Sequence, residues 1–183
     1  MIYAALLRGI NVGGNNKIEM KRLKETFQRA GMKSVTTYIN SGNVIFRDDD
    51  HAKAEIAECL EAAILEDFGL SIRVLIRSLE EFDAVMKVLP ERWTNDDQMK
   101  SDVLFLWDEV DPETVADRLD IRAVDRILYA PGAILWSVPR SDVTKSGLVK
   151  IVGTAFYRQV TVRNVNSARK IHELMREKDQ SES

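Results

Sequence analysis

The stretch IYAALLRGINVGGNNKIEM, residues 2–20, contains a predicted strand, a loop and the start of a predicted helix. Residues 2–7 are continuously apolar, which is typical of a β-strand buried on both faces. The following loop, residues 9–18, is rich in glycine and asparagine. A helical pattern then covers residues 19–30, with apolar side chains spaced to lie on one face. A strand, a glycine-rich loop and a helix, in this order, are the components of a phosphate-binding site.

The periodicity of the next segments completes a recognisable unit. Gly31 ends the first helix as a C-cap. Residues 34–39 and 44–46 are rich in β-branched and aromatic residues, and the tight link NSGN joins them, so a hairpin is expected. A helical pattern at 52–68 and an alternating strand at 71–77 follow. The order β-α-β-β-α-β predicts a ferredoxin-like unit, which is a four-stranded antiparallel sheet with two helices on one face.

The second half of the chain repeats this order after an offset of about 100 residues. A connecting helix at 79–89 and the polar segment PERWTNDDQMKSD separate the two halves. The elements then predicted are, in chain order, a strand at 102–107, a helix at 111–119, strands at 126–129 and 133–138, a helix at 146–157, a strand at 160–163 and a terminal helix at 166–178.

We therefore expect an α+β protein of two ferredoxin-like halves, pseudo-duplicated within one chain, plus a C-terminal helix. The expected domains are residues 1–77, a connecting helix and linker at 78–101, and residues 102–183. Small sheets of this type have an open face, so the two copies are expected to bury those faces or edges against each other.

The composition is that of a globular protein with a real core, at 45% hydrophobic and 30% charged residues. No apolar run approaches the ~20 residues that span a bilayer, and the N-terminus does not resemble a signal peptide. The single cysteine, Cys59, excludes an internal disulfide. These features predict a cytoplasmic protein without a membrane partner.

The net charge of −3 hides an uneven distribution of charged residues. Residues 1–47 carry a net +6, residues 48–125 a net −14 and residues 126–183 a net +5. One interpretation is solvated helix faces with accidental clustering. The other is that the two basic segments meet and attract an anion. The overall acidity counts against promiscuous nucleic-acid binding.

The opening loop does not match the two common phosphate-binding motifs. Gly9 and Gly14 have the spacing of a Walker A loop, but Asn15 stands where the motif requires lysine. The dinucleotide pattern Gly-x-Gly-x-x-Gly is absent as well, and so is the parallel β-α-β setting of both motifs.

The duplication nevertheless indicates that this loop has a purpose of its own. The corresponding connection in the second half is only DEVD, residues 108–111, so the fold does not need the longer version. Gly13 and Gly14 permit positive φ and leave backbone N–H groups exposed. Asn16 is expected to cap the helix, with Glu19 completing a capping-box-like pair. The alternative is a merely flexible loop.

The predicted topology places the loop next to the first hairpin, because strand 1 ends at the edge where strands 2 and 3 turn. Amide, hydroxyl and cationic groups would then converge on one ligand-binding region. The candidate residues are Arg8, Gly9, Asn11, Gly13, Gly14, Asn15, Lys17, Asn40, Ser41 and Asn43. Turn formation explains many of the same residues, and both explanations can hold.

The segment TVRNVNSARK is a candidate for a second wall of this ligand-binding region. Arg163 lies in the last predicted strand, and Asn164 or Asn166 can cap the terminal helix. An ordinary capped surface helix explains this segment equally well.

Three segments carry a family resemblance: LLRGINVGGNNKIEM, TYINSGNVIF and VTVRNVNSARKI. They resemble a widespread bacterial family of uncharacterised proteins, a domain of unknown function, whose members carry LLRGINVGG-x-NKI-x-M, TYI-x-SGNV-x-F and T-x-RN-x-NT-x-x-K. The resemblance covers almost the whole chain and implies two ferredoxin-like halves, but no activity. The chain departs from the pattern at Val165, where tryptophan is expected, and at Ser167, where threonine is usual. Aromatic stacking at position 165 is therefore lost.

Other chemistry has little support in the sequence. His51 and His172 lie in separate halves without metal-ligand spacing, so neither a metal site nor a cofactor is predicted. Tyr3, Phe46 and Trp136 could form a stacking face for RNA, but the consensus of an RNA-recognition motif is missing and core packing explains them better.

The sequence thus favours a binding protein for a small anionic or nucleotide-like ligand. The alternatives are an RNA-binding protein and an enzyme acting on a phosphorylated metabolite, for which Lys17 or Lys145 could serve as general acid or base. The sequence identifies neither a catalytic residue nor an oligomeric state.

Overall fold

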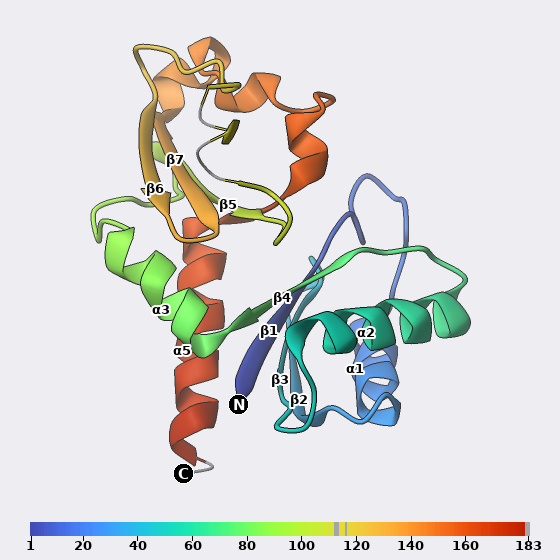
Figure 1. The fold of residues 1–183 in the computed structure, drawn as a ribbon. Helices are drawn as coiled ribbons and strands as arrows, with labels where there is room; N and C mark the ends of the chain where they lie inside the picture. Colours follow the sequence, from blue (N-terminus) through green and yellow to red (C-terminus); the bar gives the residue numbers. More distant parts are fainter. Residues whose placement is uncertain (112–113, 116, 182–183) are drawn as a thin grey trace. The chain divides into compact units, whose positions relative to one another are not determined.

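The structure is a computed structural model, and it describes residues 1–111, 114–115 and 117–181. Its elements (Figure 1) are β1 (Ile2–Leu7), α1 (Met20–Arg29), β2 (Lys33–Tyr38), β3 (Asn43–Arg47), α2 (Lys53–Phe68), β4 (Val74–Ser78), α3 (Leu79–Val88), β5 (Met99–Leu106), β6 (Arg126–Ala130), β7 (Ala133–Pro139), the 3-10 helices η1 (Arg140–Lys145), η2 (Leu148–Lys150) and η3 (Phe156–Gln159), β8 (Val160–Asn164) and α5 (Val165–Ser181). The expected start of the 111–119 helix, with Pro112 in its first position, lies outside the described residues.

The chain divides into two compact units, and the first is built on β1. This unit comprises Met1–Glu80 and the residues from Ile171 onward. Its sheet has the order β2-β3-β1-β4 with antiparallel pairing throughout. Helices α1 and α2 pack against each other on one face of this sheet (Figure 1). This strand order is that of the predicted ferredoxin-like fold.

The core of the first unit lies between this face and the two helices. Alternate residues of the central strands, such as Tyr3, Ala5 and Leu7, contact apolar residues of α1 and α2, such as Phe27 and Leu60. All six residues of β1 are buried, which confirms that this strand is covered on both faces.

The second unit, Glu81–Lys170, repeats the sheet in the order β6-β7-β5-β8. The repeat extends to single backbone hydrogen bonds. The Leu7 amide donates to the Gly42 carbonyl at 2.8 Å, and the Leu106 amide donates to the Gly132 carbonyl at 2.9 Å. The predicted α+β fold with two matching antiparallel sheets is therefore confirmed.

The covering of the second sheet differs from the prediction, because the helix expected at 146–157 is wrong. Short 3-10 helices replace it. Ser146 bonds the Leu148 amide through its hydroxyl at 3.0 Å and also donates to the Asp125 carboxylate, which holds this segment in a turn. Gly153, at φ +86°, then ends any helical path.

The polar segment after α3 is tied down within the second unit. Arg169 of α5 donates to the carbonyl oxygens of Trp93 at 2.7 Å and Pro90 at 2.8 Å. Arg140 donates to the Asp96 carbonyl at 2.8 Å. Strand β5 also begins at Met99, earlier than expected, so part of the predicted linker belongs to the sheet.

Gly147 provides a test of the second unit's packing. A Cβ atom there would lie 1.7 Å from the Asp120 carbonyl oxygen, whereas a Cβ at Gly153 would meet nothing within 4 Å. We expect Gly147→Ala to lower the free energy of unfolding by about 3 kcal/mol, as at an overpacked site. Gly153→Ala should cost about 1 kcal/mol, because only its positive φ is strained. Equal losses for the two variants in denaturant titrations would contradict this account.

Asp48 links β3 to α2 and gives a second test. Its carboxylate accepts hydrogen bonds from the amides of Asp50 and His51, both at 2.9 Å, and pairs with the His51 ring at 3.0 Å. Burial raises the pKa of Asp48, but these hydrogen bonds outweigh it and the net pKa is lowered. The hydrogen bond to Asp48 raises the pKa of His51 above 6.5.

We expect His51 to titrate above its ordinary range when followed by NMR, and Asp48→Asn to lower that pKa. Because the folded pKa is raised, the stabilisation by this pair is complete below the unfolded pKa and is lost as the pH rises through the folded value. Asp97→Asn, a change elsewhere in the chain, should leave the His51 titration unchanged. A His51 pKa at or below the ordinary value would contradict the pairing.

Candidate functional site

The loop after β1 folds back on itself as a small hairpin. Val12 and Asn15 form an isolated antiparallel bridge, and the Asn15 amide donates to the Val12 carbonyl at 3.1 Å. Gly13 and Gly14 occupy the two turn positions with φ of 59° and 79°. Two successive positive φ values are the requirement of a type I′ turn, which explains why both positions are glycine.

Asn11 joins this loop to the neighbouring hairpin. Its side-chain amide donates to the Ile18 carbonyl at 2.9 Å and to the Asn40 carbonyl at 2.8 Å. Its side-chain oxygen accepts from the Ile18 amide at 2.8 Å. The prediction that the 9–17 loop and the 40–43 hairpin share one edge of the sheet is thereby confirmed.

The hairpin itself is held by a buried amide. Asn43 donates to the Tyr38 carbonyl at 3.1 Å and to the Ser41 hydroxyl at 3.0 Å. A Cβ at Gly42 would lie 2.8 Å from the Cβ of Leu7, so only glycine fits there. Asn43 and Ser41 thus stabilise the hairpin at this edge of the sheet. Turn formation, the alternative to ligand binding considered from the sequence, accounts for both residues.

The predicted capping of α1 by Asn16 is wrong. The helix begins at Met20 with Glu19 as its N-cap residue, and no side chain caps it. Asn16 instead donates its amide to the Gly9 carbonyl at 2.9 Å, which closes the base of the loop. The amino end of α1 therefore keeps N–H groups that no side chain satisfies, and its first turn carries no acidic residue.

These elements surround a shallow depression of about 390 Å³. Its lining residues are Asn11, Gly14, Lys17, Ile18, Glu19, Met20 and Asn40. Four of them were predicted from the sequence as ligand-binding residues. Ile18, Glu19 and Met20 were missed, because Asn16 offered a plausible cap and the uncapped helix start at Glu19 was therefore not expected.

The remaining predicted residues of the first unit flank the depression without lining it. Arg8 and Gly9 begin the loop, Gly13 is the first turn residue, and Asn15 follows the turn and pairs with Val12. The Arg8 amide donates to the Arg73 carbonyl at 3.1 Å, which continues the pairing of β1 and β4.

Arg163, Asn164 and Asn166 have structural contacts within the second unit. Arg163 is buried, its guanidinium donates to the Val162 carbonyl at 2.8 Å, and burial lowers its pKa to about 10. Asn164 caps α5 by accepting from the Ser167 amide at 2.9 Å, as one of the two predicted caps. Asn166 donates to the Asn95 carbonyl at 2.8 Å.

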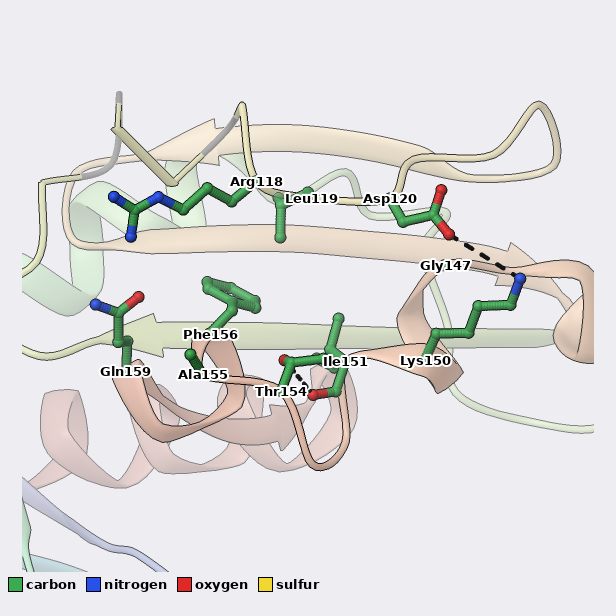
Figure 2. A pocket seen from close by; sticks show the side chains of 10 residues that line it. All are labelled: Arg118, Leu119, Asp120, Gly147, Lys150, Ile151, Thr154, Ala155, Phe156 and Gln159. Carbon is green, nitrogen blue, oxygen red and sulfur yellow. Dashed lines mark hydrogen bonds and ion pairs between the residues drawn. The ribbon is translucent and has the colours of Figure 1, made fainter.

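A cavity in the second unit was not predicted at all. It has a volume of about 240 Å³ and lies between residues 118–120 and 147–159 (Figure 2). This cavity was missed because the segment after Ser146 was expected to be one continuous helix.

The described residues contain neither a metal-binding cluster nor a membrane-spanning helix. No group of three or more His, Cys, Asp or Glu side chains in residues 1–111, 114–115 and 117–181 could hold a metal ion. Within the same part of the chain, no helix combines the length and apolar character needed to cross a membrane.

Comparisons with known proteins identify the family. Residues 1–136 match the model of a family described as protein of unknown function, DUF1697. The chain belongs to this family. A solved structure of the conserved bacterial protein SP0830 from Streptococcus pneumoniae is also similar, with 31% sequence identity and a TM-score of 0.82. That similarity covers 95% of this chain and 98% of the other. A search of curated proteins found no match.

The role of Asn11 in building the edge can be measured. Asn11→Ala leaves the Ile18 amide and carbonyl without their partner, so we expect a loss of about 1–3 kcal/mol in the free energy of unfolding. Asn11 has φ 53°, a conformation that glycine adopts without strain but alanine does not. Asn11→Gly therefore removes the hydrogen bonds alone, and it should lower the free energy of unfolding less than Asn11→Ala. Asn15→Ala, in the exposed turn, should change stability by less than about 0.5 kcal/mol. Wild-type stability of Asn11→Ala would refute this assignment.

Proposed function

We propose that the depression at the edge of the first sheet binds a small ligand with an anionic group. The observation that carries this proposal is the uncapped amino end of α1, which lies in the same wall as Lys17 and Asn40. Free backbone N–H groups and the positive end of a helix dipole favour negative charge. The family is defined without an activity, so the proposal depends on these residues.

The charges around the depression support an anion. Lys17, Lys21 and Lys24 lie in or just after the loop, and none of them forms an ion pair within the described part of the chain. Two other cations of this region are paired: Arg29 pairs with Asp67, and Lys33 lies 3.3 Å from Asp50. Unpaired lysines beside a helix amino end raise the local concentration of anions.

Glu19 restricts the kind of anion that fits. Glu19 is one of the lining residues, and a carboxylate beside the depression would repel a bare negative charge but accept hydrogen bonds. A ligand with hydroxyl groups beside its phosphate or carboxylate satisfies Lys17 and Glu19 together. Phosphorylated metabolites and nucleotide-like molecules have this arrangement, whereas inorganic phosphate does not.

RNA binding has less support than a small ligand. Tyr3 and Phe46 stack on each other inside the first core, with ring centroids 5.9 Å apart, and Trp136 is buried in the second core. These aromatic rings are therefore core residues and offer no exposed platform for stacked bases.

The test is a melting-point screen of nucleotides and phosphorylated metabolites on the native protein. A ligand at one hundred times its dissociation constant should stabilise the protein by about 2.7 kcal/mol, a shift of roughly 5–10 °C for a chain of this size. Lys17→Ala should weaken binding of that ligand by about 1.5–3 kcal/mol if the contact is direct. Gly13→Val should abolish the shift, because valine does not adopt the turn's positive φ without strain.

Matched controls separate the site from general effects of charge and stability. Lys24→Ala removes a lysine that does not line the depression, and Gly13→Asn keeps the turn because asparagine tolerates positive φ. Both should bind like the native protein. If the ligand shift survives Lys17→Ala and Gly13→Val, the site is elsewhere. RNA binding that falls steeply with salt, or turnover in the metabolite screen, would favour the RNA-binding or enzyme alternatives instead.

A further inference from the structure

The two units cover their equivalent sheets differently, and the difference leaves a cavity in the second. In the first unit, α1 and α2 pack against each other over the sheet. In the second unit, the place of the later helix is taken by η2, η3 and the turn between them. These short 3-10 segments leave an opening of about 240 Å³ beside residues 118–120.

One end of this cavity is held by a partly buried network around Asp125. Its carboxylate accepts from the amides of Arg122 at 2.8 Å and Gly147 at 3.0 Å, and from the Ser146 hydroxyl. Burial raises the pKa of Asp125, but these hydrogen bonds outweigh burial and keep its net pKa low, so the group is charged at neutral pH. The network joins residues 120–122 to residues 146–147 and fixes the distance between the two walls.

The other end is held by Trp107. Its indole N–H donates to the Arg158 carbonyl at 3.0 Å, and its backbone amide donates to the Gln159 carbonyl at 3.2 Å. Since Trp107 directly follows the central strand β5, helix η3 has a rigid support. Both ends of the cavity are therefore preorganised, which reduces the entropy lost on binding.

The lining combines an apolar floor with two different polar ends. Leu119, Ile151 and Phe156 form the floor, and the last two belong to the core of the second unit. Figure 2 shows Asp120 and Lys150 paired at one end, at 4.0 Å, and Arg118 with Gln159 at the other. Asp120 also pairs with Arg122, so the charged groups at the first end are already engaged in ion pairs.

Arg118 and Gln159 differ from that pair because their side chains are not engaged. Within residues 1–111, 114–115 and 117–181, neither the Arg118 guanidinium nor the Gln159 amide makes a hydrogen bond or an ion pair. An arginine fork beside an amide donor matches a carboxylate, which it binds through two parallel hydrogen bonds.

We infer that this cavity is a binding site for a small carboxylic acid with an apolar body. The carboxylate would contact Arg118 and Gln159, and the body would lie over Leu119, Ile151 and Phe156. The volume of about 240 Å³ lies below the roughly 300–1,000 Å³ of pockets for drug-sized ligands, so a single ring or a short branched chain is the appropriate size. The site lies wholly within the second unit and is independent of the anion site proposed above.

Benzoate is a suitable probe, because it has one carboxylate and one apolar ring. Amide chemical shifts of the ¹⁵N-labelled full chain should change with benzoate at residues 118–120 and 147–159 and saturate. Acetate, which lacks the apolar body, and benzyl alcohol, which lacks the charge, should each bind at least about tenfold more weakly, since either contact alone loses part of the interaction.

Variants then assign the contacts. Arg118→Gln should weaken benzoate binding by about tenfold to a hundredfold, as expected for a lost charged hydrogen bond. Arg126→Gln, on the edge strand β6, should leave benzoate binding unchanged. Ala155→Leu should block binding by filling the cavity, and Gly13→Val should leave it unchanged. The inference is overturned if benzoate causes no saturable shifts at these residues, if benzyl alcohol binds equally well, or if Arg118→Gln binds like the native protein.

Discussion

The hydrogen bond from the Leu7 amide to the Gly42 carbonyl determines how the functional edge of the first unit is built. It closes the end of β1 against the β2–β3 hairpin at 2.8 Å, and it requires glycine at position 42, because a Cβ there would overlap Leu7. The chain leaving β1 must therefore pass beside Asn40. Asn11 then bridges the loop to that residue, and the loop delivers Lys17 to the amino end of α1. Each later contact depends on this closure.

The second unit closes the end of its central strand β5 with an equivalent hydrogen bond, but the chain that follows takes a different course. The Leu106 amide bonds the Gly132 carbonyl, but the following residue is Trp107, whose side chain turns back to support η3. At the matching position the first unit has Arg8, followed by the long loop. A duplicated sheet thus supplies two equivalent strand ends, and the segments attached to them decide what each can bind.

Sequence patterns predicted the sheets well because their signals are local. The continuous apolar run of residues 2–7 and the alternation of the neighbouring strands follow from burial and pleating alone. The helix expected at 146–157 failed because its apolar spacing is helical while its conformation is set by distant groups. The Asp125 carboxylate accepts from the Ser146 hydroxyl and from the Gly147 amide, and neither contact can be seen in a local window. The convergence of Asn11 with Asn40 was predictable from topology, but Glu19 as the uncapped start of α1 was not, since Asn16 offered a plausible cap.

The uneven charge of the chain is explained partly by internal pairing. The basic segment 1–47 and the acidic residues that follow neutralise each other locally: Arg47 lies 2.7 Å from Asp49, Lys33 lies 3.3 Å from Asp50, and Arg29 pairs with Asp67. Solvated pairs of this kind contribute little to stability, but they remove these cations as partners for a ligand. The excess positive charge that remains is concentrated in lysines near the loop and in the first turns of α1. The paired cations fit the interpretation of solvated surface charges, and the meeting of the two basic segments stays a prediction. The proposed anion site depends only on the unpaired lysines next to the amino end of α1.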